Sequence, residues 1–166
     1  MSATPEFVLR SLTIGAGATV VIDLWALLLK QFGISSLSFA FLGRWLGHLF
    51  AGHWKHENIA KAAPIGGELW LGWLAHYSIG VSFAAVLLGM SGPEWAHNPT
   101  LLPALILGVL TVAAPLFVLQ PGMGAGVASS KTAKPLFNSV KSVITHIVFG
   151  IGLYLAALAT DWLIPA

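Results

Sequence analysis

The chain has 166 residues, of which 57% are hydrophobic and only 8% are charged, against roughly 25% charged residues in a typical soluble domain. So few charged groups cannot cover a water-soluble fold of this size, and lipid is the natural solvent for most of its surface. The net charge is +2, and no basic patch with interleaved aromatic residues predicts a nucleic-acid partner. Cysteine is absent, which excludes disulfides, thiolate metal sites and thiol catalysis.

Four apolar runs are each long enough to cross a hydrocarbon core, which needs about 20 helical residues. They comprise residues 7–32, 68–90, 101–119 and 138–164. Their boundaries carry turn or helix-breaking residues, namely Gly33, Ser91-Gly92-Pro93, Asn98-Pro99, Gln120-Pro121-Gly122 and Pro135. The sequence therefore predicts a single all-α integral-membrane domain over residues 1–166 with four transmembrane helices.

The basic residues predict how these helices are oriented. Seven of the eight lie in or beside the first and third connections, namely Lys30, Arg44, Lys55, Lys61, Lys131, Lys134 and Lys141. The positive-inside rule then places both connections in the cytoplasm and both termini outside it. Arg10, near the amino terminus, is the one basic residue that argues against this orientation.

The first connection also predicts a helix of its own. Over residues 36–50, apolar side chains recur near helical spacing, with Arg44 and His48 between them. Such a pattern suits a cytoplasmic helix lying in the membrane interface. The alternative is a helix packed on the cytoplasmic end of the bundle.

Short matches between spans suggest an internal repeat. The second span contains His76-Tyr-Ser-Ile-Gly80 and the fourth contains His146-Ile-Val-Phe-Gly150, while residues 19–25 of the first span match residues 111–117 of the third. A duplicated helical hairpin would explain both matches, with its halves related by an axis along the membrane normal.

Three ionisable residues inside the spans form the candidate site. Asp23, His76 and His146 each lie eight or nine residues from the cytoplasmic end of their helix. At 1.5 Å of rise per residue, they share a layer roughly 12 Å below the boundary. An ionisable group at that depth costs several kcal/mol unless it faces the interior and finds a partner. We therefore expect these three side chains to converge.

Helical spacing supports an inward face for these residues. Small residues stand one turn away from them, at Thr19, Gly80 and Gly150, which lets helix backbones approach closely. The third span contributes Gln120 at its end, and Pro115, whose missing N–H frees the carbonyl four residues earlier.

The polar layer admits several functions. It could bind a cation or proton that serves translocation of a small solute or ion, because His titrates near neutral pH. It could instead hold a transition metal ion. It could also hold haem b, with His76 and His146 as axial ligands and with Gly80 and Gly150 leaving room for the macrocycle. A bound metal ion or haem would support redox or hydrolytic activity. An Asp–His pair could also simply join helices, and the chain could be a homo-oligomer or a non-catalytic subunit of a larger membrane complex. Whether the protein is an enzyme stays open.

Two further groups of residues carry weaker signals. His48, His53 and His56 have spacings of five and three, which favour surface or interfacial residues over metal ligands. No partner for His97 can be identified from the sequence.

A glycine-rich segment after the third span could form an N–H nest for a phosphate or lipid head group. It lacks the P-loop register, and it could simply be a loop that ends the helix. Its residues are Gly122, Gly124, Gly126, Ser129, Ser130 and Lys131.

Several motifs spread over nearly the whole chain carry a family resemblance. They are Gly17-Ala-Thr19 with Asp23-Leu-Trp25, Gly43-Arg-Trp-Leu-Gly-His48, Gly72-Trp-Leu-Ala-His76-Tyr77, Pro99-Thr-Leu-Leu-Pro-Ala104, Gln120-Pro-Gly-Met-Gly-Ala-Gly126, and Thr145-His146 with Phe149-Gly-Ile-Gly-Leu-Tyr154. Together they resemble an uncharacterised bacterial integral-membrane family, domain-of-unknown-function family 2938. The resemblance implies four helices in the bacterial cytoplasmic (inner) membrane, and it implies no activity.

Overall fold

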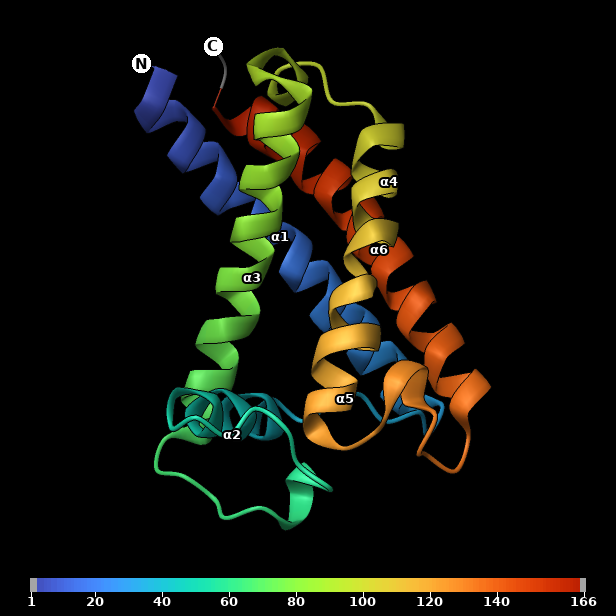
Figure 1. The fold of residues 1–166 in the computed structure, drawn as a ribbon. Helices are drawn as coiled ribbons and strands as arrows, with labels where there is room; N and C mark the ends of the chain where they lie inside the picture. The colour runs from blue at the N-terminus through green and yellow to red at the C-terminus, as the bar shows by residue number, and fades with distance from the viewer. Residues whose placement is uncertain (1–2, 165–166) are drawn as a thin grey trace. The chain divides into compact units, whose positions relative to one another are not determined.

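The computed structural model describes residues 3–164, and every regular element within them is helical, as predicted (Figure 1). The α-helices are α1 (Ala3–Gln31), α2 (Phe39–Phe50), α3 (Glu68–Ser91), α4 (Leu101–Thr111), α5 (Gln120–Met123) and α6 (Pro135–Leu163). Short 3-10 turns form η1 (Ile59–Lys61), η2 (Pro93–Ala96) and η4 (Val127–Ser129), and a π-helical turn forms η3 (Pro115–Leu119). Four helices are long and apolar enough to cross a membrane, namely Thr4–Gln31, Glu68–Ser91, Leu101–Met123 and Pro135–Leu163.

The third span ends later than the sequence predicts. Residues 120–122 do not break it at Leu119, and the helix continues to Met123. The π-helical turn before this point accommodates Pro115, and the Gln120 N–H donates to the Pro115 carbonyl. The helix stops at Gly124, which has the left-handed conformation, with φ 95°, that a glycine adopts without strain.

The fourth span begins earlier than predicted, at Pro135 rather than at residue 138. Proline is suited to the first turn of a helix, where its missing N–H has no intrahelical acceptor. The expected breaker therefore acts as a helix start.

The described helices contribute to two compact units. Unit 1 comprises Met1–Ile34, Tyr77–Thr111 and Thr145–Ala166, and unit 2 comprises Ser35–His76 and Val112–Ile144. Each unit has its own apolar core, centred in unit 1 on residues such as Ile14 and Leu153 and in unit 2 on Trp45 and Met123.

In unit 1, helices touch backbone to backbone at small residues, as expected from the sequence. A Cβ atom added to Gly15 of α1 would overlap the backbone of Val81 in α3, and one added to Gly80 would overlap the Thr19 side chain. A Cβ on Gly108 of α4 would come within 2.6 Å of the α6 backbone. These approaches leave room for hydrogen-bonding side chains to reach across between helices.

In unit 2, α2 packs against the start of α3, lying crosswise to it in Figure 1. The predicted helix over residues 36–50 begins at Phe39, and its buried face contains Leu42, Gly43, Arg44 and Trp45. Arg44 makes a two-pronged ion pair with Glu68 at 2.7 and 2.8 Å, which raises the pKa of the Arg44 guanidinium above its ordinary value. α2 is therefore held against the start of α3, and its position in the membrane interface stays a prediction.

Candidate functional site

Hydrogen bonds between side chains join the helices of unit 1 at one end. The Tyr77 hydroxyl in α3 donates to Asp23 Oδ2 in α1 at 2.9 Å. The Trp25 indole N–H in α1 lies 3.3 Å from the Thr145 hydroxyl in α6. Tyr77 and Thr145 are the residues at which the α3 and α6 segments of unit 1 begin, so both bonds lie at the same end of the unit.

His146 lies at this end as well, bonded to α4. Its Nδ1 is 2.8 Å from the hydroxyl of Thr111, the last residue of the α4 segment. The Thr111 hydroxyl also lies 2.6 Å from the Gly108 carbonyl, which can only accept a proton. The single hydroxyl proton therefore points to Gly108, and the bond to His146 needs a proton on Nδ1. In the neutral ring, Nε2 is then left with a lone pair that can bind a proton.

The remaining two predicted site residues, His76 and Gln120, belong to unit 2. The His76 ring packs against Phe39, with 4.5 Å between ring centroids, and lies 6.0 Å from the Trp73 ring. The Gln120 side chain donates to the Ser142 hydroxyl at 3.2 Å and accepts from the Ser129 hydroxyl at 3.0 Å. Gln120 thus ties the third span to α6 and to the glycine-rich segment.

The geometry bears on the metal and haem hypotheses. Among residues 3–164, no three His, Asp or Glu side chains are grouped closely enough to hold a metal ion. The space beside Gly80 and Gly150 is filled by α1 and by α4, respectively. These two glycines therefore serve contact between helices, and haem binding by His76 and His146 stays a prediction. The convergence of Asp23, His76 and His146 stays a prediction.

The glycine-rich segment bonds largely to itself. The Ala125 N–H donates to the Gln120 carbonyl at 2.8 Å, and the Lys131 N–H donates to the Ala125 carbonyl at 2.9 Å. Ala128 and Ser129 both have positive φ, at 48° and 61°, which is strained backbone for residues other than glycine. The backbone N–H groups of Ala125 and Lys131 thus bond to carbonyl groups of the same stretch of chain. The binding of a phosphate or lipid head group at this segment stays a prediction.

Two of the three clustered histidines form a pair in unit 2. His48 Nδ1 lies 2.7 Å from His56 Nε2, and the backbone N–H of His56 donates to the Gly122 carbonyl at 2.8 Å. His53, by contrast, is exposed. The pair joins α2 to α5, a role that the spacing of five and three does not reveal.

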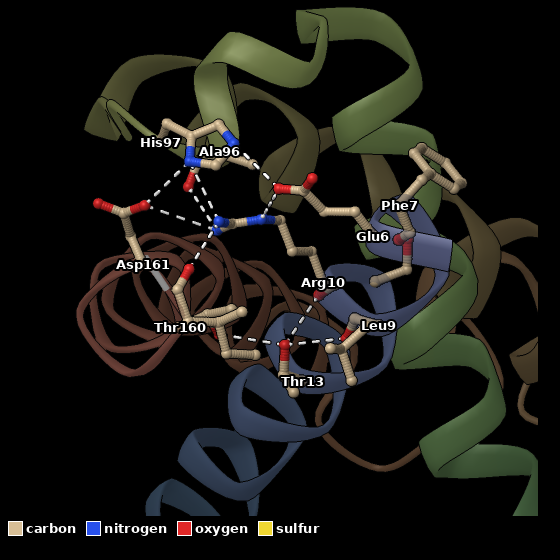
Figure 2. A network of polar contacts seen from close by, with 11 residues as sticks. Glu6, Phe7, Leu9, Arg10, Thr13, Ala96, His97, Thr160 and Asp161 are labelled. Carbon is tan, nitrogen blue, oxygen red and sulfur yellow. Dashed lines mark hydrogen bonds and ion pairs between the residues drawn. The ribbon is translucent and has the colours of Figure 1, made fainter. Parts of the chain in front are cut away.

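A second polar cluster, which the sequence reasoning missed, lies at the far end of unit 1 (Figure 2). Arg10 is only 2% exposed, and its guanidinium bonds Glu6 at 2.9 Å and the carbonyls of Ala96 and Ile164 at 3.2 and 2.8 Å. Asp161 lies 3.6 Å from it. The sequence does carry one signal for this cluster, because Glu6 and Arg10 have the i, i+4 spacing of a helical ion pair.

His97 completes this cluster from the loop after η2. Its Nε2 is 3.0 Å from Glu6 Oε1, and its Nδ1 is 3.1 Å from an Arg10 nitrogen and 3.2 Å from Asp161 Oδ1. The partner of His97 that the sequence could not identify is therefore a charged network drawn from α1 and α6. Arg10, the basic residue that argues against the predicted orientation, thus makes ion pairs and hydrogen bonds within this cluster.

The comparison with known families gives one match. The sequence model of a family described as "Protein of unknown function (DUF2938)" matches residues 12–160, which confirms the resemblance seen in the sequence motifs. No curated protein and no solved structure matches the chain.

Proposed function

The chain belongs to this family, whose description assigns no activity, so we propose a function from the residues of the chain itself. In this proposal it is a four-span protein of the bacterial cytoplasmic membrane that binds a proton or small cation and translocates a small ion or solute. The residues that would carry this function are Asp23, His76, His146 and Gln120. Both termini lie outside the cytoplasm in this proposal, as the distribution of basic residues indicates.

The observation that supports the proposal most directly is the setting of Asp23 and His146. Both ionisable groups sit inside apolar spans, and each has a hydroxyl partner on another helix, at 2.9 Å from Tyr77 and 2.8 Å from Thr111. A carboxyl group, an imidazole and a hydroxyl can each take up a proton and release another, so a chain of such groups can pass a proton along. Groups of this kind within a membrane span are expensive to keep, which favours a functional role.

A proton fits the described geometry better than a metal ion. A metal would need several ligands converging at about 2.1 Å, and the described residues hold no such group. A proton needs only one lone pair, such as that of His146 Nε2, together with a neighbouring acceptor. We therefore take proton binding as the first form of the proposal and cation binding as the second.

The test uses purified protein in liposomes that enclose a pH-sensitive dye. A potential imposed across the membrane should drive protein-dependent acidification or alkalinisation, and Asp23→Asn should reduce the initial rate by about tenfold or more because it removes the charge but keeps the shape. Repeating the assay with Na⁺, K⁺ or Mn²⁺ gradients tests the cation form.

A matched control separates function from folding. Glu94→Gln removes an exposed carboxylate outside the spans and should leave the flux unchanged. Thermal unfolding should place Asp23→Asn within a few degrees of the parent protein. Equal flux for the parent protein, for Asp23→Asn and for empty liposomes would overturn the proposal, and a collapse of stability in Asp23→Asn would make the carboxylate a structural group.

A further inference from the structure

The cluster around Arg10 has an unequal charge balance. Glu6 and Asp161 contribute two negative charges, and Arg10 contributes one positive charge. With a neutral imidazole at His97 the four side chains carry a net charge of −1, and with an imidazolium they are neutral. Near a membrane boundary, where charge is poorly solvated, the neutral arrangement is favoured.

The hydrogen bonds around His97 cannot all form in one protonation state. Its Nδ1 stands almost equally far from a donor, Arg10 at 3.1 Å, and from an acceptor, Asp161 at 3.2 Å. An unprotonated Nδ1 accepts from Arg10 and faces the Asp161 carboxylate with a lone pair. A protonated Nδ1 donates to Asp161 and gives up the bond from Arg10. On the other side of the ring, Nε2 needs its proton in both states, because Glu6 lies 3.0 Å away and can only accept.

We propose that Glu6, Arg10, His97 and Asp161 form a proton-binding site in which His97 takes the proton and exchanges a hydrogen bond from Arg10 for one to Asp161. A proton from water adds to the lone pair of His97 Nδ1. The O–H bond of the hydronium ion that delivers it is the one covalent bond that breaks, and the hydrogen bond from Arg10 to Nδ1 is given up. The His97 side chain is 28% exposed, so water reaches it, whereas Arg10 is 2% exposed and keeps the Ile164 carbonyl as an acceptor in both states.

The proton adds a second helix to the one that holds His97, which lies in the loop after η2. In the neutral state, His97 is bonded only to groups on α1, namely Glu6 and Arg10. In the protonated state it bridges Glu6 of α1 and Asp161 of α6. Glu94, the one charged residue of η2, is exposed. The site thus couples proton uptake to a link between the loop and the carboxyl-terminal end of α6, and it is independent of the layer at Asp23.

The experiment is nitrogen NMR of protein labelled with ¹⁵N only at histidine, in lipid nanodiscs, between about pH 5 and 9. The His97 signals are identified by their loss in His97→Gln. We expect an imidazolium at the acid end and, after deprotonation, a ring with its proton on Nε2 and none on Nδ1. In Asp161→Asn the proton affinity of His97 should fall by about tenfold, because a negative charge at contact distance is gone.

Two further variants keep the test decisive. Glu6→Gln removes the carboxylate at Nε2 and should lower the same affinity, which covers the case in which Asp161→Asn does not fold. Glu94→Gln should leave it unchanged. Backbone amide exchange over residues 94–97, corrected for its intrinsic pH dependence, should rise severalfold when His97 loses its proton, and this change should be absent in His97→Gln. A neutral ring with its proton on Nδ1, or an affinity unaffected by both carboxylate variants, would overturn the proposal.

Discussion

The Tyr77 hydroxyl donates to Asp23 Oδ2 at 2.9 Å, which joins α3 to α1 within unit 1. Tyr77→Phe keeps the ring and removes this bond, so we expect it to lower the free energy of unfolding by about 1 kcal/mol, the typical value for such a bond between membrane helices. Denaturation in detergent measures the change. Tyr154→Phe is the control, because Tyr154 is the other tyrosine of the chain and packs against the apolar core of unit 1. An equal loss in both variants would mean that the bond to Asp23 adds nothing.

Two glycines in spanning helices should respond to alanine in opposite directions. Gly15→Ala places a methyl group against the backbone of Val81 and should cost about 1–3 kcal/mol through overpacking. Gly89→Ala meets nothing within 4 Å, so it should be neutral or should stabilise α3 by up to about 1 kcal/mol through helix propensity. Unfolding of the two variants in the same detergent gives a direct comparison. A tolerated Gly15→Ala would contradict the close approach of α1 and α3.

The sequence predicts most of the fold because the bilayer imposes a length and a composition on each span. The four spans and the helix of the first connection follow from apolar runs and their period alone. Their ends do not, because Gln120-Pro121-Gly122 continues a helix when a π-helical turn at Pro115 precedes it. That outcome depends on the backbone path through the preceding turn, which residue preferences do not encode.

The candidate site is less accessible from the sequence. Asp23 and His146 stand out because ionisable residues are rare in spans, but their hydroxyl partners could not be chosen among many Ser, Thr and Tyr residues. The Arg10 cluster draws on residues up to 154 positions apart, such as Arg10 and Ile164. Helix depth places Arg10, His97 and Asp161 near one membrane face, yet only three-dimensional packing brings them into contact.

The ion pair between Arg44 and Glu68 should contribute to stability in a way that another cation at position 44 cannot replace. Arg44→Lys retains a cation but cannot hold both Glu68 oxygens and the carbonyls of Ile59 and Ala62 at once. We expect a drop of several degrees in the unfolding temperature and faster protease cleavage within residues 51–67. Lys61→Arg, in an exposed position of the same connection, is the control. Unchanged cleavage in Arg44→Lys would show that α2 packing alone orders this segment.

The proposed orientation can be checked by labelling single cysteines, since the chain has none of its own. Glu94→Cys should react with a membrane-impermeant maleimide added to intact spheroplasts, whereas Ser130→Cys should react only after the membrane is opened. Both positions are exposed, and the connection that contains Ser130 carries basic residues while the one that contains Glu94 carries none. A permeant maleimide should label both. The reverse pattern would invert the topology and would put Arg10 on the cytoplasmic side.

The last prediction concerns the proton on His146. Thr111 directs its hydroxyl proton to Gly108, so the neutral His146 ring should carry its proton on Nδ1 and expose a lone pair on Nε2. In Thr111→Val the shape is nearly kept but Nδ1 loses its acceptor, and the ring should shift toward the tautomer with the proton on Nε2. Thr111→Ser retains the hydroxyl and should restore the parent tautomer. ¹⁵N chemical shifts of histidine-labelled protein report the two forms directly. If His146 Nε2 is the atom that binds the transported proton, flux in liposomes should fall in Thr111→Val, because Nε2 then already carries a proton in the neutral ring. Flux in Thr111→Ser should stay close to that of the parent protein. A tautomer that is the same in all three proteins would mean that Thr111 does not set the position of the His146 proton.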